Sequence, residues 1–591
     1  MFAQNGVSDD GFIPLIQPPP KYIKSLGVSV QINSDNNNLQ ITAQNDEEKK
    51  AVNYLKYLFN TVAENNFKLE FNSEKSNEDV TWNITFEIID FDPSFVNDQY
   101  YSIESNSGEK ITVIASPSQL GLLYGAVTLS NFIENTNDKI SLHLFDVKDY
   151  PSYKNRIANS IPEVGKVGEL FDFALRNKLE TIAIAHRIFP WHKIDKDYAK
   201  LLTEIKEWKD KFGGPYVMQM QNIYDEKYIN LANQDDIANL KKVIKTSIEH
   251  GVDRLMILAD DTPPFEFGKG YVLPHENEKK KYKHMAEAHV ELMWDLKNWL
   301  TEISLQSDLY YVPTFYTGED MHYGDMSLYI DTPWEDEAFK PLEEDLNYIG
   351  SNMPDDVHVI WSGPYVRSRK ITAKDLNKWT YYLNGKVPFL WDNTIYSHHP
   401  FTATPLFTAY DNDLPSDFHL LTGNNGMFIN GNANTEDSKA ATITVLDYLW
   451  SPDSYEPERS LNTAIERHYG KELVKPLLKF KETELEIRKT IGERRLWYES
   501  DTLWTIIRKA RYTHSKSPFY FHYNYTRMKA LRLQLKNSVQ EPLPKEDFIK
   551  ECILMDDKRN KILQKIKLIN KKVYNNINGI TIELPNFEKI Q

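Results

Sequence analysis

The sequence contains only one cysteine, Cys552, among 591 residues. A single thiol excludes an internal disulfide and a metal cluster held by several thiolates, so packing alone must stabilise the fold. No apolar run approaches the roughly 20 residues of a bilayer-spanning helix, which excludes a protein that crosses a membrane. Basic side chains are also scarce, because 69 Lys and Arg stand against 85 Asp and Glu. The resulting net charge of -16 has the wrong sign for broad nucleic-acid binding.

What the sequence does contain is typical of a large globular protein. Hydrophobic residues make up 41% and charged residues 26% of the chain. The length suffices for about three or four domains of ordinary size. The first residues show neither a basic nor an apolar segment of signal type, but Phe2-Ala3-Gln4 fits the remainder of a trimmed export signal. We therefore expect a periplasmic or secreted protein.

Residues 1–150 combine strand-like and helix-like patterns. Alternating apolar and polar residues predict half-buried strands at 28–32, 81–86 and 111–114. Amphipathic spacing predicts one helix from Asp46 to about residue 64 and another after Ser118. These elements indicate a separate N-terminal α/β domain. Its boundary is expected at 149–152, where the turn-prone sequence contains Pro151.

Short apolar runs and amphipathic helices alternate over residues 151–440. The eight runs are 156–160, 181–185, 216–221, 255–259, 309–313, 357–361, 387–391 and 427–430. Predicted helices between them include 167–177, 198–211, 236–249, 285–302 and 374–383. This alternation favours a parallel (β/α)8 TIM barrel, whose strands are buried on both faces. A doubly wound open sheet is the alternative, and the lack of a Gly-rich phosphate loop at 159–163 disfavours it.

After about residue 440 the strand pattern ends. Helical periodicity predicts a helical domain over 441–591, with helices at 438–449, 458–469, 472–492, 504–512, 525–538 and 548–570. The aromatic loop at 519–525 has two interpretations, which are stacking on sugar rings and packing between domains.

The dipeptide Asp-Asp occurs five times, but only Asp260-Asp261 ends a buried strand. The prolines that follow at 263 and 264 stop that strand at the mouth where barrel enzymes hold their chemistry. Two close carboxylates in a partly dry site cannot both ionise easily, so one serves as general acid while the other stays anionic. The alternatives are a structural pair and half of a divalent-cation site. His284 and His289 lie on the next predicted helix, without metal-ligand spacing, and we interpret them as packing or polar-face residues.

The other strand ends contribute polar and aromatic side chains to the same mouth. Arg187 follows the second run, Tyr316 the fifth, Trp361 the sixth, Trp391 and Asn393 the seventh, and Asn430 the eighth. Indole faces provide apolar walls for a pyranose ring, and amides provide directional partners for its hydroxyl groups. This composition predicts a carbohydrate substrate, with neither a metal nor an organic cofactor.

At these residues the chain resembles glycoside hydrolase family 84, which comprises β-N-acetylglucosaminidases related to O-GlcNAcases and hyaluronidases. The motifs are Asp260-Asp261, the Ala-His pair at 288–289, Pro-Thr-x-Tyr at 313–316, Trp-Ser-Gly at 361–363, Trp-x-Asn at 391–393, and Gly426 to Asn430 followed by Ser438-Lys439. Residues 101–129 similarly resemble the non-catalytic N-terminal domain of hexosaminidases and α-glucuronidases. The matches extend over nearly the whole chain.

The resemblance implies a retaining, substrate-assisted hydrolysis of β-N-acetylglucosaminides. Asp260 would orient the substrate's acetamido group, and Asp261 would protonate the leaving oxygen and then activate water. Tyr316 would hold the acetamido oxygen and Trp391 would wall its pocket. Trp361, Asn393 and Asn430 are further expected to contact the sugar.

Four departures from the family pattern affect the side that would bind the distant hydroxyl groups. Ser-Ile-Pro-Glu at 160–163 replaces Gly-Phe-Tyr-Gly, Arg187 replaces a lysine, His398 an aspartate and Val312 a cysteine. Arg187 can grip a carboxylate or sulfate in a fork, and His398 removes a negative charge. Three hypotheses follow, which are a β-N-acetylhexosaminidase, a glycosidase for an acidic or sulfated sugar on the same scaffold, and a catalytically inactive carbohydrate-binding homologue. Tolerated drift at the rim of the site would equally account for the departures.

Overall fold

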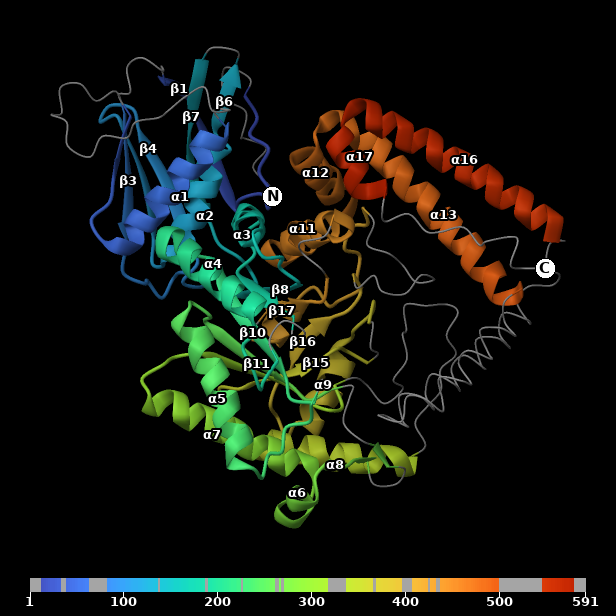
Figure 1. Ribbon diagram of the computed structural model, residues 1–591. Coiled ribbons are helices and arrows are strands. Elements are labelled where there is room, and N and C mark those ends of the chain that lie inside the picture. Colours follow the sequence, from blue (N-terminus) through green and yellow to red (C-terminus); the bar gives the residue numbers. More distant parts are fainter. Residues whose placement is uncertain are drawn as a thin grey trace.

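The structure is a computed structural model. It describes residues 12–32, 39–62, 82–136, 139–185, 190–224, 227–260, 265–266, 270–316, 336–364, 368–395, 407–423, 426–431, 436–498 and 545–578. In these ranges an N-terminal sheet, a central barrel and a group of long helices follow one another along the chain (Figure 1).

The N-terminal part is a seven-stranded mixed sheet. Its strands are β1 (Tyr22–Ile32), β2 (Leu39–Thr42), β3 (Trp82–Ile88), β4 (Tyr101–Asn106), β5 (Ile111–Ser116), β6 (Ile133–Thr136) and β7 (Lys139–Asp149). They are ordered β1-β7-β4-β5-β3-β2, and β6 pairs with β7. The strands predicted at 28–32, 81–86 and 111–114 are thus found within β1, β3 and β5.

Helices α1 (Asp46–Val62) and α2 (Gln119–Ser130) cover this sheet, as the periodicity predicts. Helix α2 begins after Ser118, whose hydroxyl accepts a hydrogen bond from the Gly121 amide at 3.2 Å and so caps the first turn. Leu175 and Phe212 of the barrel helices join the buried cluster of the sheet and its two helices. The N-terminal part is therefore packed on the barrel.

The central part is a closed barrel of eight parallel strands, which confirms the predicted (β/α)8 fold. The strands are β8 (Asn155–Ser160), β9 (Thr181–Ile184), β10 (Tyr216–Asn222), β11 (Arg254–Leu258), β14 (Asp308–Val312), β15 (His358–Trp361), β16 (Phe389–Asp392) and β17 (Gly426–Ile429). Gly426 pairs with Asn155 where the last strand closes on the first. A Cβ at Gly426 would overlap the Asn155 carbonyl, and φ is +121° there, so this closure requires glycine.

The outer ring of the barrel contains α3 (Val167–Arg176), α4 (Lys196–Phe212), α5 (Gln234–Glu249), α7 (Met285–Glu302), α8 (Asp336–Asn352), α9 (Ala373–Tyr382) and α11 (Glu436–Trp450). Short elements lie between them, namely β12 (Phe265–Glu266), β13 (Gly270–Tyr271), α6 (Glu276–Lys281) and α10 (Phe418–Leu421). Helix α11 follows β17 and contacts both β17 and β8. It therefore belongs to the barrel, and the boundary expected at 440 falls inside this helix.

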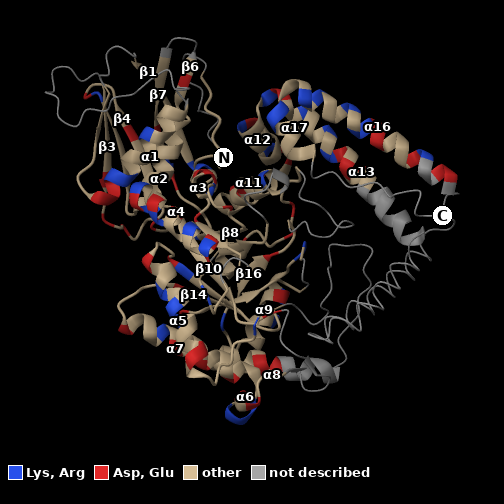
Figure 2. Cartoon of the chain, in the orientation of Figure 1, with Lys and Arg blue, Asp and Glu red and all other residues tan. Residues whose placement is uncertain are grey.

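Long helices form the C-terminal part, namely α12 (Pro457–Tyr469), α13 (Val474–Tyr498), α16 (Lys545–Ile569) and α17 (Lys571–Asn578). Helices α13 and α16 lie side by side and share a buried cluster with α12 and α17 (Figure 1). Basic and acidic residues are interspersed along α16 (Figure 2). The helices predicted at 504–512 and 525–538 and the aromatic loop at 519–525 lie outside the described ranges. Within those ranges, no helix combines the length and apolar character needed to cross a membrane.

Candidate active site

All eight strands contribute to one buried cluster, which is the interior of the barrel. Its members are Ile157, Ala183, Met218, Met220, Met256, Leu258, Tyr310, Val312, Ile360, Phe389 and Phe428. Intervening residues such as Ile257, Ala259, Tyr311 and Trp361 belong instead to the cluster between strands and helices. Because side chains alternate along a strand, every second residue beyond an interior position continues toward the mouth of the barrel.

Asp260 lies at this mouth. It follows β11, where Met256 and Leu258 are interior residues. Asp260 is two residues beyond Leu258, so it lies on the same, inward-facing side of the strand. It is half-buried, whereas the preceding residues of the strand are buried. Asp261, the other acid of the predicted pair, lies outside the described residues, as do Arg187 and His398.

Tyr316 and Trp391 extend the interior cluster toward the mouth of the barrel. Both are partly buried and pack against it, Tyr316 beyond β14 and Trp391 within β16. The Trp391 ring stacks on Phe428 with a centroid distance of 3.9 Å and an interplanar angle of 18°. The indole is thus fixed over the centre of the barrel, and it forms one wall of the mouth.

A row of amides connects the last strands of the barrel to the first. Trp391 Nε1 donates to Asn393 Oδ1 at 2.8 Å, and Asn430 Nδ2 donates to the same oxygen at 2.6 Å. Asn159 Nδ2 then donates to Asn430 Oδ1 at 3.1 Å. The structure therefore brings Trp391, Asn393 and Asn430 together, as the positions at strand ends predict, and adds Asn159 from β8.

Asn159 is a site residue that the sequence did not identify. Its Oδ1 is inaccessible to water and accepts no hydrogen bond from any residue in the described ranges. The only sequence signal was its place two residues after Ile157, an interior position of the first strand. Through its Nδ2 bond Asn159 orients Asn430, so it affects a ligand by holding the amide row in place.

Asp392, between Trp391 and Asn393 in the sequence, has a buried carboxylate that accepts four hydrogen bonds. The backbone amide and hydroxyl of Thr394 donate to its Oδ1 at 2.7 and 2.6 Å. Tyr410 Oη and Asn412 Nδ2 donate to its Oδ2, each at 2.8 Å. Burial raises the pKa of Asp392, and the hydrogen bonds from Thr394 and Tyr410 oppose that shift. The carboxyl group is saturated with donors, so it acts by positioning Trp391 and Asn393 on either side of it.

Trp361 is not part of this mouth, and the expectation that it contacts a sugar needs correction. Ile360 faces the interior, so Trp361, one residue later, faces the helices. Its side chain is 1% exposed and lies near-parallel to Trp379 of α9, with a centroid distance of 5.9 Å and an interplanar angle of 20°. The structure gives this indole a packing role.

A buried chain of hydrogen bonds joins β14, α7 and the segment after β10. His289 Nδ1 lies 2.7 Å from Tyr311 Oη, and its Nε2 lies 2.7 Å from Tyr224 Oη. Burial lowers the pKa of His289 to about 3, so the ring is neutral. Burial also raises the pKa of Tyr311 well above its ordinary value, and the carboxylates of Asp345 and Asp260 raise it further. Burial likewise raises the pKa of Tyr224 well above its ordinary value, so both tyrosines keep their protons beside the candidate site.

The two histidines considered as metal ligands have other partners. His284 precedes α7, and its Nδ1 lies 3.2 Å from Asp345 Oδ1, an interaction that raises the pKa of His284. His289 is enclosed by the two tyrosines, as the packing interpretation predicts. Over the described ranges, no group of three or more His, Cys, Asp or Glu side chains is arranged to hold a metal ion.

Comparison with known proteins points to one class of enzyme. Residues 219–482 match the family model described as beta-N-acetylglucosaminidase. This stretch begins in β10, ends in α13, and includes Asp260, Tyr316, Trp391, Asn393 and Asn430.

Solved structures with low sequence identity share the fold. CpGH84B aligns over 95% of this chain and 93% of its own with a TM-score of 0.59 and 18% identity. CpGH84D aligns over the same fractions, with a TM-score of 0.59 and 16% identity. An inactive mutant of the GH20 exo beta-N-acetylglucosaminidase from Vibrio harveyi covers 79% of this chain and 77% of its own, with a TM-score of 0.51 and 11% identity.

Proposed function

Because the chain is a glycoside hydrolase that carries a β-N-acetylglucosaminidase domain over residues 219–482, we propose that Asp260 and Asp261 catalyse substrate-assisted cleavage of terminal or internal β-linked N-acetylglucosamine. The observation that carries this proposal is the alternation of side chains along the barrel strands between the interior and the helices. Asp260, Trp391, Asn393 and Asn430 all continue the inward-facing series of their strands into the same mouth.

In the proposed first step, the acetamido oxygen of the substrate attacks the anomeric carbon. Asp260 accepts the acetamido N–H, which increases the electron density on that oxygen and stabilises the positive charge of the cyclic intermediate. The bond to the leaving oxygen breaks as Asp261 transfers a proton to it. The phenol of Tyr316 donates to the acetamido oxygen and keeps it aligned.

In the second step, Asp261 removes a proton from water, which attacks the anomeric carbon from the face that the leaving group vacated. The carbon–oxygen bond to the acetamido group breaks, and the sugar is released with its original configuration. Trp391 forms the apolar wall against which the acetamido methyl group packs.

The amide row supports a neutral sugar over an acidic one. Within the described ranges, the side of the mouth formed by Asn159, Asn393 and Asn430 carries no charge. Amides both donate and accept hydrogen bonds, as hydroxyl groups require, whereas binding of a uronate or sulfate is expected to rely on a cation. The row therefore fits the hydroxyl groups of N-acetylglucosamine, whereas Arg187, the cation on which binding of an acidic sugar would rely, lies outside the described residues.

The first test compares the two aspartates with one matched control acid elsewhere in the chain. Asp260→Asn and Asp261→Asn should each lower kcat/KM for an aryl β-N-acetylglucosaminide by at least about 100-fold, the usual contribution of such a group. Asp261→Asn should retain more activity on substrates whose leaving group needs no proton. Asp355→Asn changes an exposed acid of another Asp-Asp pair and should leave the rate unchanged. Equal rates in all three variants would refute the assignment.

The second test probes the nucleophile. Successive fluorination of the acetamido methyl group withdraws electrons from the carbonyl oxygen, so kcat/KM should fall steeply from the acetyl to the trifluoroacetyl substrate. The configuration of the first-formed product, followed by NMR, should be retained. A flat fluorine series or an inverted product would contradict participation of the acetamido group.

A further inference from the structure

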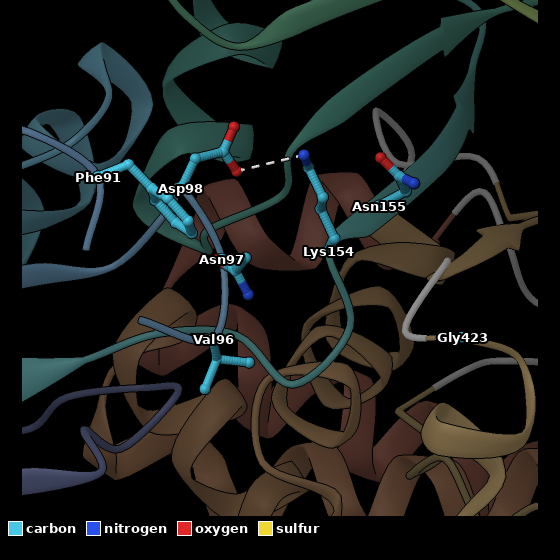
Figure 3. A pocket seen from close by; sticks show the side chains of 7 residues that line it. All are labelled: Phe91, Val96, Asn97, Asp98, Lys154, Asn155 and Gly423. Carbon is cyan, nitrogen blue, oxygen red and sulfur yellow. Dashed lines mark ion pairs between the residues drawn. The ribbon is translucent and has the colours of Figure 1, made fainter. Parts of the chain in front are cut away.

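A hollow of about 450 Å³ lies at the end of the barrel opposite Asp260. It is lined by the loop that carries Phe91, Val96, Asn97 and Asp98, by Lys154 and Asn155 at the start of β8, and by Gly423 before β17 (Figure 3). Asn155 begins the strand whose far end carries Asn159 and Ser160. Five residues of extended chain span about 16 Å, so the hollow is separate from the candidate active site.

The polar floor of the hollow is held in place by other groups. Asn97 is 9% exposed, donates to the Pro151 carbonyl at 2.9 Å and accepts from the Gln99 amide at 3.0 Å. Asn155 Oδ1 accepts from Arg254 Nη2 at 3.2 Å. The N-terminal loop and the barrel are thus fixed relative to one another where they line the hollow, and a ligand would meet a preformed site.

One ion pair faces the opening. Lys154 Nζ lies 3.4 Å from Asp98 Oδ1, and the two side chains remain 48% and 45% exposed. The other carboxylate oxygen of Asp98 is directed away from Lys154 (Figure 3). The pair offers donors and an acceptor while its charges cancel, which suits a neutral ligand with several hydroxyl groups better than an anion or a cation.

An exposed aromatic ring borders the same opening. Phe91 is 52% exposed, although its edge-to-face contact with Phe95, at 6.1 Å and 77°, orients the ring. Phe95 is itself stacked on Tyr100 at 4.1 Å and 9°. The ring therefore has a defined position beside the ion pair, and its open face can contact the C–H face of a pyranose.

We propose that this hollow is a second carbohydrate site, which holds one neutral hexopyranose unit of a glycan without cleaving it. Phe91 supplies the apolar platform, and Asp98 and Lys154 accept from and donate to the hydroxyl groups. The volume lies within the range of small-molecule sites. Such a site would hold a polymeric or protein-linked glycan near the enzyme while another part of it enters the barrel mouth.

Affinity electrophoresis of the full chain tests the proposal. The native protein is run through gels that contain glycol chitin, hydroxyethyl cellulose, galactomannan or the anionic polymer hyaluronan. We expect at least one neutral polymer to retard the wild type, and Phe91→Ala and Asp98→Asn to weaken that retardation by about fivefold or more. Tyr381→Ala, which removes an exposed aromatic ring on α9, is the matched control and should run like the wild type.

Two further measurements separate this site from the barrel mouth. Phe91→Ala should hydrolyse an aryl β-N-acetylglucosaminide at the wild-type rate, which also shows that it is folded. Trp391→Ala should keep its retardation although its mouth is impaired. The proposal is refuted if no neutral polymer retards the wild type, if hyaluronan alone does so, or if retardation survives Phe91→Ala but disappears in Trp391→Ala. If the wild type does not hydrolyse the aryl glycoside at all, the proposed hydrolase mechanism is refuted, whereas the proposal of this second site is unaffected.

Discussion

Asn159 and Asn430 are 271 residues apart in the sequence, yet the Asn159 amide donates to Asn430 Oδ1 at 3.1 Å. The contact joins β8, the first strand of the barrel, to the residue directly after β17, the last strand. Asn430 in turn donates to Asn393, so Asn159 fixes which oxygen and which N–H groups this row presents to the mouth. The buried Oδ1 of Asn159 accepts no hydrogen bond from the described residues.

Replacement of Asn159 should therefore impair substrate binding more than chemistry. In Asn159→Ala, we expect KM for an aryl β-N-acetylglucosaminide to rise about fivefold with little change in kcat, because one neutral hydrogen bond contributes about 1 kcal/mol. Steady-state kinetics measures this split. Asn53→Ala, which removes an amide bonded to Lys211 O on the surface of α1, should leave both constants unchanged. An unchanged KM in Asn159→Ala would show that the residue only closes the barrel.

Trp361 and Trp391, which lie in the neighbouring strands β15 and β16, should behave differently when each is replaced by alanine. Trp391→Ala removes a wall of the mouth and should raise KM at least tenfold, or about 1.4 kcal/mol. Trp361→Ala creates a cavity between β15 and α9 and should lower the free energy of unfolding by about 3–5 kcal/mol. The folded fraction of Trp361→Ala should retain the wild-type KM. Kinetics together with thermal unfolding distinguishes the two roles, and a large KM effect in Trp361→Ala would restore it to the site.

The architecture of the barrel could be predicted because its strands are buried on both faces. The apolar run at 255–259, for example, differs from β11 (Arg254–Leu258) by one residue at each end. Parallel strands place their carboxyl ends together, so Trp391, Asn393 and Asn430 could be grouped before their contacts were known. The amphipathic helices likewise match closely, since the helix predicted at 285–302 is α7.

Two features of the site could not be predicted, for different physical reasons. The face of a strand residue depends on register, and a shift by one position reverses it. The sequence pattern therefore places Trp361 at the mouth, whereas in the structure it lies against Trp379. The Asn159–Asn430 contact depends on closure of the barrel, which no local pattern records. The order of strands in the N-terminal sheet could not be predicted for the same reason, because β1 pairs with β7 more than 100 residues later.

The buried histidine behind β11 predicts how stability depends on pH. Burial lowers the pKa of His289 to about 3 in the folded state, against about 6.5 in an unfolded chain. The unfolded state therefore binds more protons between these values, so the stabilising contribution is complete above pH 6.5 and is lost as pH falls toward 3. From this residue alone, the free energy of unfolding should fall by up to about 1.4 kcal/mol per pH unit between pH 6 and 4.

Thermal unfolding at several pH values tests this linkage. His289→Phe should be less stable than the wild type at pH 7, since it leaves the hydroxyl groups of Tyr224 and Tyr311 without their partner. Its Tm should nevertheless decrease less steeply between pH 6 and 4. His250→Gln, a change at the end of α5, should keep the wild-type slope. Identical slopes in all three proteins would show that another group governs the acid sensitivity.

The buried carboxylate of Asp149 predicts a stability defect that is separate from activity. It ends β7 and accepts hydrogen bonds from Tyr101 Oη at 2.7 Å, Lys178 Nζ at 2.9 Å and Trp450 Nε1 at 2.8 Å. Burial lowers the pKa of Lys178, and the charge of Asp149 opposes that shift. The carboxylate thereby joins the N-terminal sheet to the barrel and to α11.

Asp149→Asn should lower the free energy of unfolding by about 3–5 kcal/mol, because Lys178 is left buried without its counter-ion. Scanning calorimetry should show a lower Tm, while KM at 25 °C should remain that of the wild type. Asp46→Asn removes the exposed partner of Lys49 and should change stability by less than about 1 kcal/mol. A second substitution, Lys178→Met, should recover part of the loss in Asp149→Asn, since it removes the unpaired charge. If the double variant is no more stable than Asp149→Asn, the defect arises from the lost hydrogen bonds of Tyr101 and Trp450 and not from the buried ammonium group.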